Sequence, residues 1–115
     1  MVSKSKAKGN GFEHEIVREA IAYGLNAVRA RGSDGRSIGE HEEVDCKVGP
    51  YKIQAKRRRK LTNYMIPSEH VDAVVCREDR GETLIVFPYD QFLALLAIAV
   101  HVEQESRGYK EASDV

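Results

Sequence analysis

Three residues of this sequence, Asp45, Gln54 and Lys56, have types and spacing that suit chemistry. The carboxylate and the amide oxygen are hard ligands of the kind that Mg²⁺ binds together with phosphate oxygens and water. Lys56 lies two residues after Gln54 and shares its face of a strand, from which it can orient a water or offset charge on a phosphoryl oxygen. With a metal ion that activates the water, the trio predicts phosphodiester cleavage. The alternative is that these residues are simply the solvated face of an amphipathic hairpin.

An amphipathic hairpin is the element that must position the trio. Residues 43–48 and 51–58 alternate between apolar and polar side chains, as two strands with one buried face do. The dipeptide Gly49-Pro50 between them fits a two-residue turn. With that turn, the residue numbers of cross-strand partners sum to 99.

This register brings the side chains of the trio next to one another. Asp45 is expected directly opposite Gln54, with Cβ atoms roughly 5 Å apart. Glu43 then faces Lys56. Glu43 is therefore either a further carboxylate for the site or the cross-strand ion-pair partner of Lys56.

Glu13 is another candidate carboxylate, on a helix that we predict for residues 11–23. Apolar residues recur there at helical spacing, with Asn10 as the N-cap and Gly24 as the stop. The segment from Asn10 to Glu13 also matches a capping box, in which the glutamate accepts a hydrogen bond from the N-cap N–H. Glu13 is therefore either part of the site or a helix cap.

The rest of the chain predicts short strands, connections and a second helix. Residues 32–40 are rich in Gly, Ser and Asp and lack periodicity, which indicates a flexible loop. The other predicted elements are a strand at 25–30, a polar connection at 61–68, strands at 71–76 and 83–87, and a helix at 90–105.

Charge is divided unevenly along the chain although the formal net charge is zero. Residues 1–60 contain 14 Lys and Arg against 8 Asp and Glu, and residues 61–115 contain 4 against 10. Charge runs are usually solvated faces, but the run from Lys56 to Lys60 begins at the trio, so we predict salt-sensitive phosphate contact without sequence preference. The residues assigned to DNA binding are Lys8, Arg29, Arg31, Arg36, Arg57, Arg58, Arg59 and Lys60.

Length, cysteine content and hydropathy exclude other classes of protein. A chain of 115 residues with 42% hydrophobic content is expected to form a single domain. Its two cysteines, Cys46 and Cys76, have neither disulfide-framework nor zinc-site spacing. The longest apolar run, residues 92–100, is shorter than the roughly 18 residues that span a bilayer, and the basic N-terminal segment does not match a secretory signal. We expect a soluble cytoplasmic protein with no membrane partner.

Several segments, taken in order, resemble the archaeal Holliday junction resolvases and their phage relatives, which belong to the PD-(D/E)xK nuclease superfamily. The resemblance covers roughly residues 8–96. The matching segments are Lys8-Gly-Asn-Gly-Phe-Glu13 with the helix after it, Ala27-Val-Arg29, Gly32-Ser33, Val44-Asp45 and Ile53-Gln54-Ala-Lys56.

The resemblance implies a fold, an activity and residue roles. The fold is α/β and restriction-endonuclease-like, a single domain with a central mixed β-sheet of about five strands flanked by helices. The activity is that of a Holliday junction resolvase, an endodeoxyribonuclease that cuts four-way DNA junctions with Mg²⁺ or Mn²⁺. By similarity, Asp45 bridges the metal, Gln54 holds the second acidic position, Lys56 is the catalytic lysine, Glu13 lies near the metal, and Ser33 is an active-site loop serine.

Two residues depart from the family pattern. Val44 replaces the usual proline before the aspartate, with little expected effect because the strand sets the direction of the Asp45 side chain. Gln54 replaces the usual glutamate and removes one negative charge from the metal site, which should lower metal affinity. Since some members of the superfamily carry Gln there, we interpret a variant active site, with Glu43 as a candidate compensating carboxylate.

The apolar residues 92–100 fall within a predicted helix that is apolar on all sides, and such a helix must be buried on all sides. We expect part of it to form a homodimer interface, which also suits a junction that needs two symmetric cuts. The alternative is that its own sheet and the first helix cover it.

The predicted organisation is a basic flexible arm at residues 1–9, a nuclease domain at 10–105 and a polar C-terminal tail at 106–115. Three other functions stay open. The chain is alternatively another PD-(D/E)xK nuclease, restriction-like or acting on branched DNA in general; a junction-binding protein that Gln54 has impaired catalytically; or a structural dimerisation module.

Overall fold

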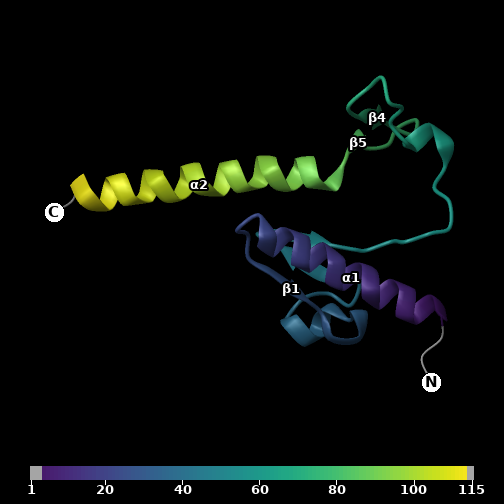
Figure 1. The fold of residues 1–115 in the computed structure, drawn as a ribbon, viewed down its shortest axis with the longest axis horizontal. Coiled ribbons are helices and arrows are strands. Elements are labelled where there is room, and N and C mark those ends of the chain that lie inside the picture. Colours follow the sequence, from purple (N-terminus) through teal and green to yellow (C-terminus); the bar gives the residue numbers. More distant parts are fainter. Residues whose placement is uncertain (1–3, 114–115) are drawn as a thin grey trace. The chain divides into compact units, whose positions relative to one another are not determined.

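Two helices and two small antiparallel sheets make up this α/β chain. The computed structural model describes the backbone of residues 4–113 and the side chains of residues 11–32 and 34–108. We predicted a single domain, and the contacts of the chain gather in two compact units, residues 1–58 (unit 1) and residues 59–115 (unit 2). Figure 1 shows the elements of both units.

Helix α1 (Lys4–Ala22) begins earlier than predicted. Asn10 and Gly11 lie inside the helix, so the predicted N-cap and the capping-box alternative for Glu13 are wrong. A glycine in a helix interior costs only about 1 kcal/mol, which a helix of this length tolerates. The backbone of residues 4–9, predicted as a flexible arm, is helical, and the side chains of residues 4–10, Lys8 among them, lie outside the described residues.

The end of α1 follows the prediction. Gly24 has a φ of 82°, a left-handed conformation that glycine adopts without steric cost. The N–H of Gly24 donates to the carbonyl of Ile21 at 2.9 Å, and the N–H of Leu25 donates to that of Ala20 at 3.1 Å. These two bonds form a Schellman motif, which satisfies carbonyls at the helix end.

The sheet of unit 1 contains the predicted hairpin. Its elements in chain order are β1 (Ala27–Arg29), the 3-10 turns η1 (Arg31–Ser33) and η2 (Gly35–Ile38), β2 (Cys46–Val48) and β3 (Tyr51–Ile53). The strand order is β1-β2-β3, antiparallel throughout, and Val48 pairs with Tyr51 while Cys46 pairs with Ile53. The predicted two-residue turn and its register are confirmed. Gly49 takes a φ of 55°, which the first position of a type II′ turn requires.

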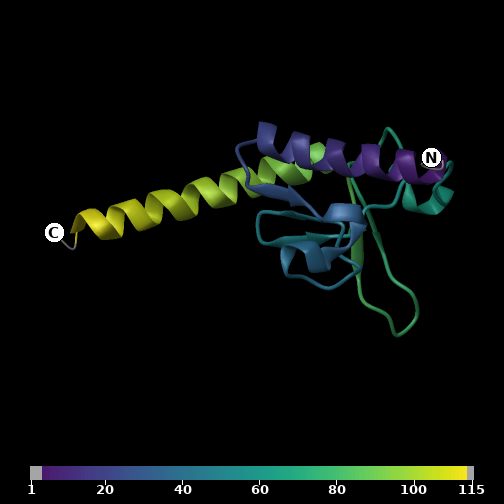
Figure 2. The ribbon, with the colours of Figure 1, turned by 90° about the horizontal axis from the view of Figure 1, so that it is seen from below.

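Helix α1 packs on this sheet, mainly on β1 and β2, as Figure 2 shows. The predicted alternation is confirmed on β2 and the residues before it, because positions 44, 46 and 48 are buried and 45 and 47 are half-buried. Burial of each large aliphatic side chain contributes roughly 1.5–3 kcal/mol. The buried apolar residues of this unit are Ile16, Ala20, Leu25, Ala30, Val44, Cys46 and Val48.

Unit 2 contains a second hairpin and the long helix. Its elements are η3 (Asn63–Met65), β4 (Val74–Cys76), β5 (Leu84–Val86) and α2 (Tyr89–Ser113). Strands β4 and β5 pair antiparallel, with Val75 opposite Ile85. Both strands and the helix were predicted, although the strands are shorter. Helix α2 runs past Glu105, so the backbone of residues 106–113, predicted as a polar tail, is helical.

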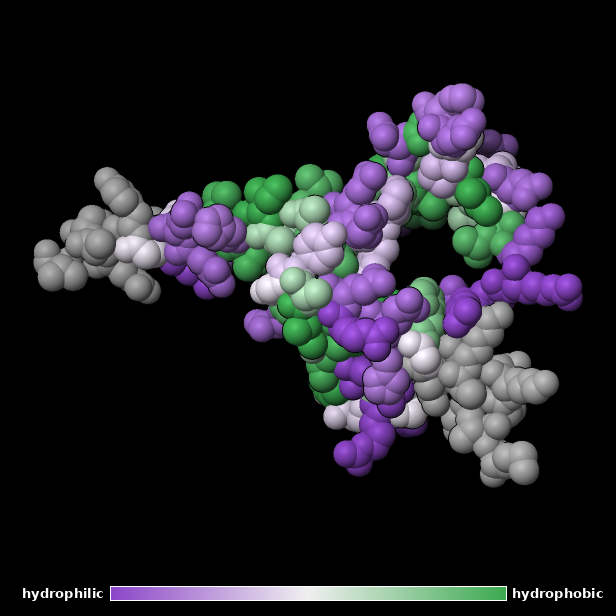
Figure 3. Space-filling view, in the orientation of Figure 1, coloured by the Kyte–Doolittle hydropathy of each residue, from purple (hydrophilic) through white to green (hydrophobic). Residues whose placement is uncertain are grey.

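Helix α2 has a buried face and an exposed apolar face. Leu93 and Leu96 are buried, whereas Leu95, Ile98 and Val102 are more than half exposed. Figure 3 shows hydrophobic surface along much of the helix and hydrophilic surface toward its C-terminal end. The expectation that residues 92–100 are buried on all sides is therefore not met within this chain. Among the described residues, neither helix combines the length and apolarity that crossing a membrane requires.

The predicted strands form two separate sheets. Three strands belong to unit 1 and two to unit 2, and every pairing among the described residues is antiparallel. The described residues thus show an α/β chain with small antiparallel sheets, without the mixed sheet that the resemblance implies.

Candidate functional site

Asp45 is held from both sides at the start of β2. Its backbone N–H donates to the carbonyl of Ile53 at 2.9 Å, and its carbonyl accepts from the N–H of Ala30 at 2.8 Å. Its side-chain Oδ2 accepts a third bond, at 2.7 Å, from the N–H of Ala55. These bonds fix both the backbone and the carboxylate of Asp45.

Gln54 and Lys56 flank the residue that this carboxylate binds. Both are exposed while Ala55 between them is half-buried, so the predicted alternation is confirmed here. Regular pairing stops at Cys46 and Ile53, and the Asp45 carboxylate contacts the backbone beyond Gln54 instead of facing Gln54 across a ladder. The structure nevertheless brings all three residues of the trio to one end of one hairpin.

Glu13 is buried and paired with Arg29. Its side chain is 5% exposed, and its Oε2 lies 3.2 Å from a guanidinium nitrogen of Arg29. Arg29 pairs with Cys46 in the sheet, so strand alternation turns it toward α1. Two charges in a buried setting offset one another's desolvation. Glu13 therefore lies on the α1 side of the sheet. Arg29, which we had assigned to DNA binding, forms an internal ion pair with it.

The buried thiol of Cys46 lies near two of the predicted carboxylates. Burial first, and then the negative charges of Glu13 and Asp45, together raise the pKa of Cys46 to about 11. Such a thiol stays protonated at neutral pH and acts as a small apolar side chain.

Glu40 joins two lysines on the polar face of the hairpin. Lys47 and Lys52 are cross-strand partners, and their ammonium groups lie 3.1 and 3.2 Å from the two carboxylate oxygens of Glu40. Hydrogen bonds from Lys47 and then Lys52 hold the pKa of Glu40 below its usual value. Like charges opposite each other in a sheet are unfavourable, so Glu40 neutralises a repulsion that the strand register creates.

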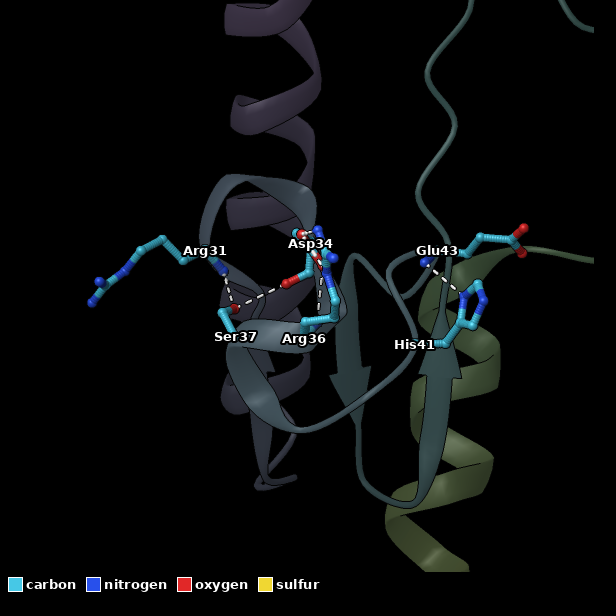
Figure 4. Close-up of polar contacts among 6 residues, drawn as sticks. All are labelled: Arg31, Asp34, Arg36, Ser37, His41 and Glu43. Atoms are coloured by element: carbon cyan, nitrogen blue, oxygen red, sulfur yellow. Dashed lines mark hydrogen bonds and ion pairs between the residues drawn. The ribbon is translucent and has the colours of Figure 1, made fainter.

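The segment predicted as a flexible loop is an ordered pair of 3-10 turns, so that prediction is wrong (Figure 4). Asp34 caps η2 by accepting a hydrogen bond from the N–H of Arg36 at 3.0 Å, and the Arg36 guanidinium donates further hydrogen bonds to the same carboxylate. The side-chain bond from Arg36, followed by the backbone bond, lowers the pKa of Asp34. The hydroxyl of Ser37 accepts from the N–H of Arg31 at 2.7 Å and donates to the Asp34 carbonyl at 3.0 Å.

Close packing explains why this segment is ordered. Gly35 is buried, and a Cβ there would lie 1.9 Å from the carbonyl oxygen of His41. The ring Nδ1 of His41 accepts from the N–H of Glu43 at 3.1 Å, and the Glu43 side chain points away from the ring (Figure 4). Among the described residues Glu43 forms no ion pair, so the predicted pair with Lys56 is not present.

The residues assigned to DNA binding differ in exposure and in whether they form ion pairs. Arg31 is exposed and its guanidinium points away from the loop (Figure 4), whereas Arg36 is engaged by Asp34. The run at 56–60 is exposed and irregular in backbone. The side chains of Lys8 and Ser33 lie outside the described residues.

The donor set at the hairpin bears on the predicted metal. Within the described part of the chain, no three His, Cys, Asp or Glu side chains gather as a metal site. Mg²⁺ is usually held by one or two carboxylates with phosphate oxygens and waters. The Asp45 carboxylate and the amide oxygen of the exposed Gln54, whose neighbour Ala55 donates to that carboxylate, are oxygen donors of the kind that suits such an ion.

Sequence reasoning missed Asp34, Glu40 and the Ala55 N–H. Asp34 had a signal, because Asp before Gly is a frequent turn and cap residue. Glu40 and the Ala55 N–H had none, since their partners are fixed only by tertiary structure. No family model matches this chain, and comparisons with curated proteins and with solved structures gave no match. The resemblance to Holliday junction resolvases stays a prediction.

Proposed function

We propose that this chain is a Holliday junction resolvase, a structure-selective, metal-dependent endodeoxyribonuclease that cuts four-way DNA junctions by phosphodiester hydrolysis. The observation that carries the proposal is the hydrogen bond from Ala55 to the Asp45 carboxylate, which brings the residue between Gln54 and Lys56 to that carboxylate. The restriction-endonuclease-like fold and a cytoplasmic location belong to the same proposal.

Asp45 and the Gln54 amide oxygen would hold Mg²⁺ or Mn²⁺, and Glu13, engaged by Arg29, would take part only through water. The ion supplies Lewis acidity and a more acidic water. Because Gln54 is neutral, the site carries less negative charge than a pair of carboxylates and should need more metal to fill.

Lys56 is the group of this site that suits the reacting phosphate. Like Gln54, it is exposed, and the half-buried Ala55 lies between them. Its ammonium group would orient the attacking water and offset charge on a phosphoryl oxygen. The water oxygen bonds to phosphorus, the P–O3′ bond breaks, and a proton passes to the leaving 3′ oxygen, which leaves a 5′ phosphate.

Basic residues around the hairpin would bind the flanking phosphates. Unit 1 contains 12 Lys and Arg against 8 Asp and Glu, so it is the basic unit of a neutral chain. Arg31 is exposed in η1, and Arg57 and Arg58, which follow Lys56 directly, are exposed too. Arg59 and Lys60 are exposed in unit 2. Backbone contacts of this kind give affinity without sequence preference and weaken as salt rises.

The proposal includes a homodimer formed through α2. Leu95, Ile98 and Val102 recur at intervals of three and four residues and expose between 57% and 61% of their surface, which is unusual for apolar side chains in one stripe. Sedimentation tests this part: Ile98→Glu should give a monomer and Gln104→Glu, on the same helix, should not. A wild-type chain that sediments as a monomer at micromolar concentration would contradict the homodimer.

A panel of DNA substrates tests the proposal and separates it from a related nuclease. Duplex, flap and four-way junction DNA of matched length are incubated with the chain and Mg²⁺ or Mn²⁺. We expect cutting of the junction in preference to the others. Equal cutting of all forms would indicate a general nuclease of the same superfamily, and absence of salt-dependent DNA binding would favour a structural module.

The impaired-enzyme alternative rests on Gln54 and has its own test. In that case the junction is bound but not cut under any metal or pH, whereas Gln54→Glu, which adds the missing charge, restores cutting. Our proposal expects the wild type to cut, and Gln54→Glu to lower the Mg²⁺ concentration for half-maximal rate. Gln104→Glu adds the same charge on α2 and serves as the control.

A further inference from the structure

Gln54 and Lys56 lie in the segment that follows β3, beyond the last residue of the strand. Strand β3 ends at Ile53, and the carbonyl of that residue already accepts from Asp45. Among the described residues, no backbone hydrogen bond joins positions 54–56 to β2. An exposed segment without ladder bonds is expected to fray.

A side-chain bond takes over where the ladder stops. Oδ2 of Asp45 accepts from the N–H of Ala55 at 2.7 Å, in a half-buried position. A carboxylate that accepts from a backbone N–H makes a shorter and stronger bond than a carbonyl does. The bond fixes the middle residue of three, and Gln54 and Lys56 are exposed on either side of the half-buried Ala55, as in an extended chain.

We propose that Asp45 is a positioning residue for Lys56, acting through the Ala55 N–H, in addition to its role as a ligand. One carboxylate oxygen anchors the strand, and the other stays available to a cation. The two roles depend on different properties of Asp45: the anchor needs an acceptor oxygen, and the cation needs the negative charge. The consequence for DNA rests on the proposed function, whereas the anchor itself does not.

Two substitutions separate these properties. Asp45→Asn keeps an acceptor oxygen and removes the charge, and Asp45→Ala removes both. Hydrogen exchange at the Ala55 amide reads the anchor directly. We expect protection at Ala55 in the wild type, about tenfold or more above that of Lys56, a smaller loss in Asp45→Asn, and a loss of about tenfold to a hundredfold in Asp45→Ala.

Binding of the junction DNA without divalent metal tests whether the anchor positions Lys56. Both variants lose the same negative charge, so a difference between them reports the anchor alone. We expect Asp45→Asn to bind the junction several-fold more tightly than Asp45→Ala. Asp34→Ala is the matched control. It removes another carboxylate that accepts a hydrogen bond from a backbone N–H, that of Arg36, and it should leave the Ala55 amide protected.

The outcomes keep the anchor and the nuclease proposal apart. Fast exchange of Ala55 in the wild type, or equal exchange in the two Asp45 variants, overturns the anchor. If Asp45→Ala does not fold, the hydrogen-exchange protection of Ala55 relative to Lys56 in the wild type still tests the anchor. A protected Ala55 in a chain that neither binds nor cuts a junction would support the anchor and contradict the proposed function.

Discussion

The two hairpins of the described residues are built from strands of the same length, but only the first has fully buried side chains. In the hairpin of β2 and β3, α1 packs on one side, and Cys46 and Val48 are fully buried. In the hairpin of β4 and β5, the cross-strand partners Val75 and Ile85 are 64% and 58% exposed. A two-stranded sheet alone is at best marginally stable. The packing of α1, more than the pattern of the strands, therefore stabilises the first hairpin.

The polar faces of the two hairpins differ as well. On the first, Glu40 neutralises Lys47 and Lys52, and Asp45 holds the backbone of Ala55. Beside the second, the described residues form a longer side-chain hydrogen bond, 3.4 Å from the Arg77 guanidinium to the Thr83 hydroxyl. Side chains that are to act on a substrate must be held in place, and the first hairpin meets that condition.

The largest expected effect is at the ion pair beneath the first hairpin. Arg29→Met removes the guanidinium that lies 3.2 Å from the buried Glu13 carboxylate, which should cost about 3–5 kcal/mol in the free energy of unfolding measured with urea. Arg18→Met, at an exposed position of α1, should change it by less than about 0.5 kcal/mol. A loss below about 1 kcal/mol for Arg29→Met would show that the pair does not anchor this hairpin.

A matched pair of substitutions compares the two hairpins directly. Val48→Thr buries a hydroxyl in the core under α1 and should cost about 1–3 kcal/mol in urea unfolding. Val75→Thr makes the same change on the exposed face of β4 and should stay within about 0.5 kcal/mol. Equal losses at the two positions would mean that β4 and β5 are covered as fully as β2 and β3.

The smallest effect concerns pH and the polar face of the first hairpin. The lowered pKa of Glu40 in the folded chain means that its contribution to stability is complete above the usual carboxyl range and is lost as pH falls through the lowered value. The wild type should therefore exceed Glu40→Gln in urea midpoint at pH 7, and the difference should shrink toward pH 3. Glu42→Gln, at an exposed residue, should show no such trend.

Much of the first hairpin could be predicted because its signals are local. Strict alternation and a turn of fixed length determine the register, so the pairing of Val48 with Tyr51 followed from the sequence. The stop of α1 at Gly24 is equally local, since glycine is favoured in a left-handed conformation.

The remaining features depend on tertiary contacts that no local pattern encodes. The start of α1 was misplaced because cap signals at Asn10 compete weakly with a helix that is already favourable. The order of the segment after β1 depends on Gly35 fitting against His41. Glu13 was assigned to the site or to a cap, and its partner Arg29 became visible only when the helix was placed on the sheet.

Cleavage of a synthetic four-way junction by the wild type and by Asp45→Asn, with Mg²⁺ or Mn²⁺, tests the central claim most directly. Asn keeps the acceptor for Ala55 and removes the charge that a cation needs. We expect metal-dependent cutting by the wild type and a rate at least about 100-fold lower for Asp45→Asn. Cutting by the variant at the wild-type rate would contradict the assignment of the site to Asp45.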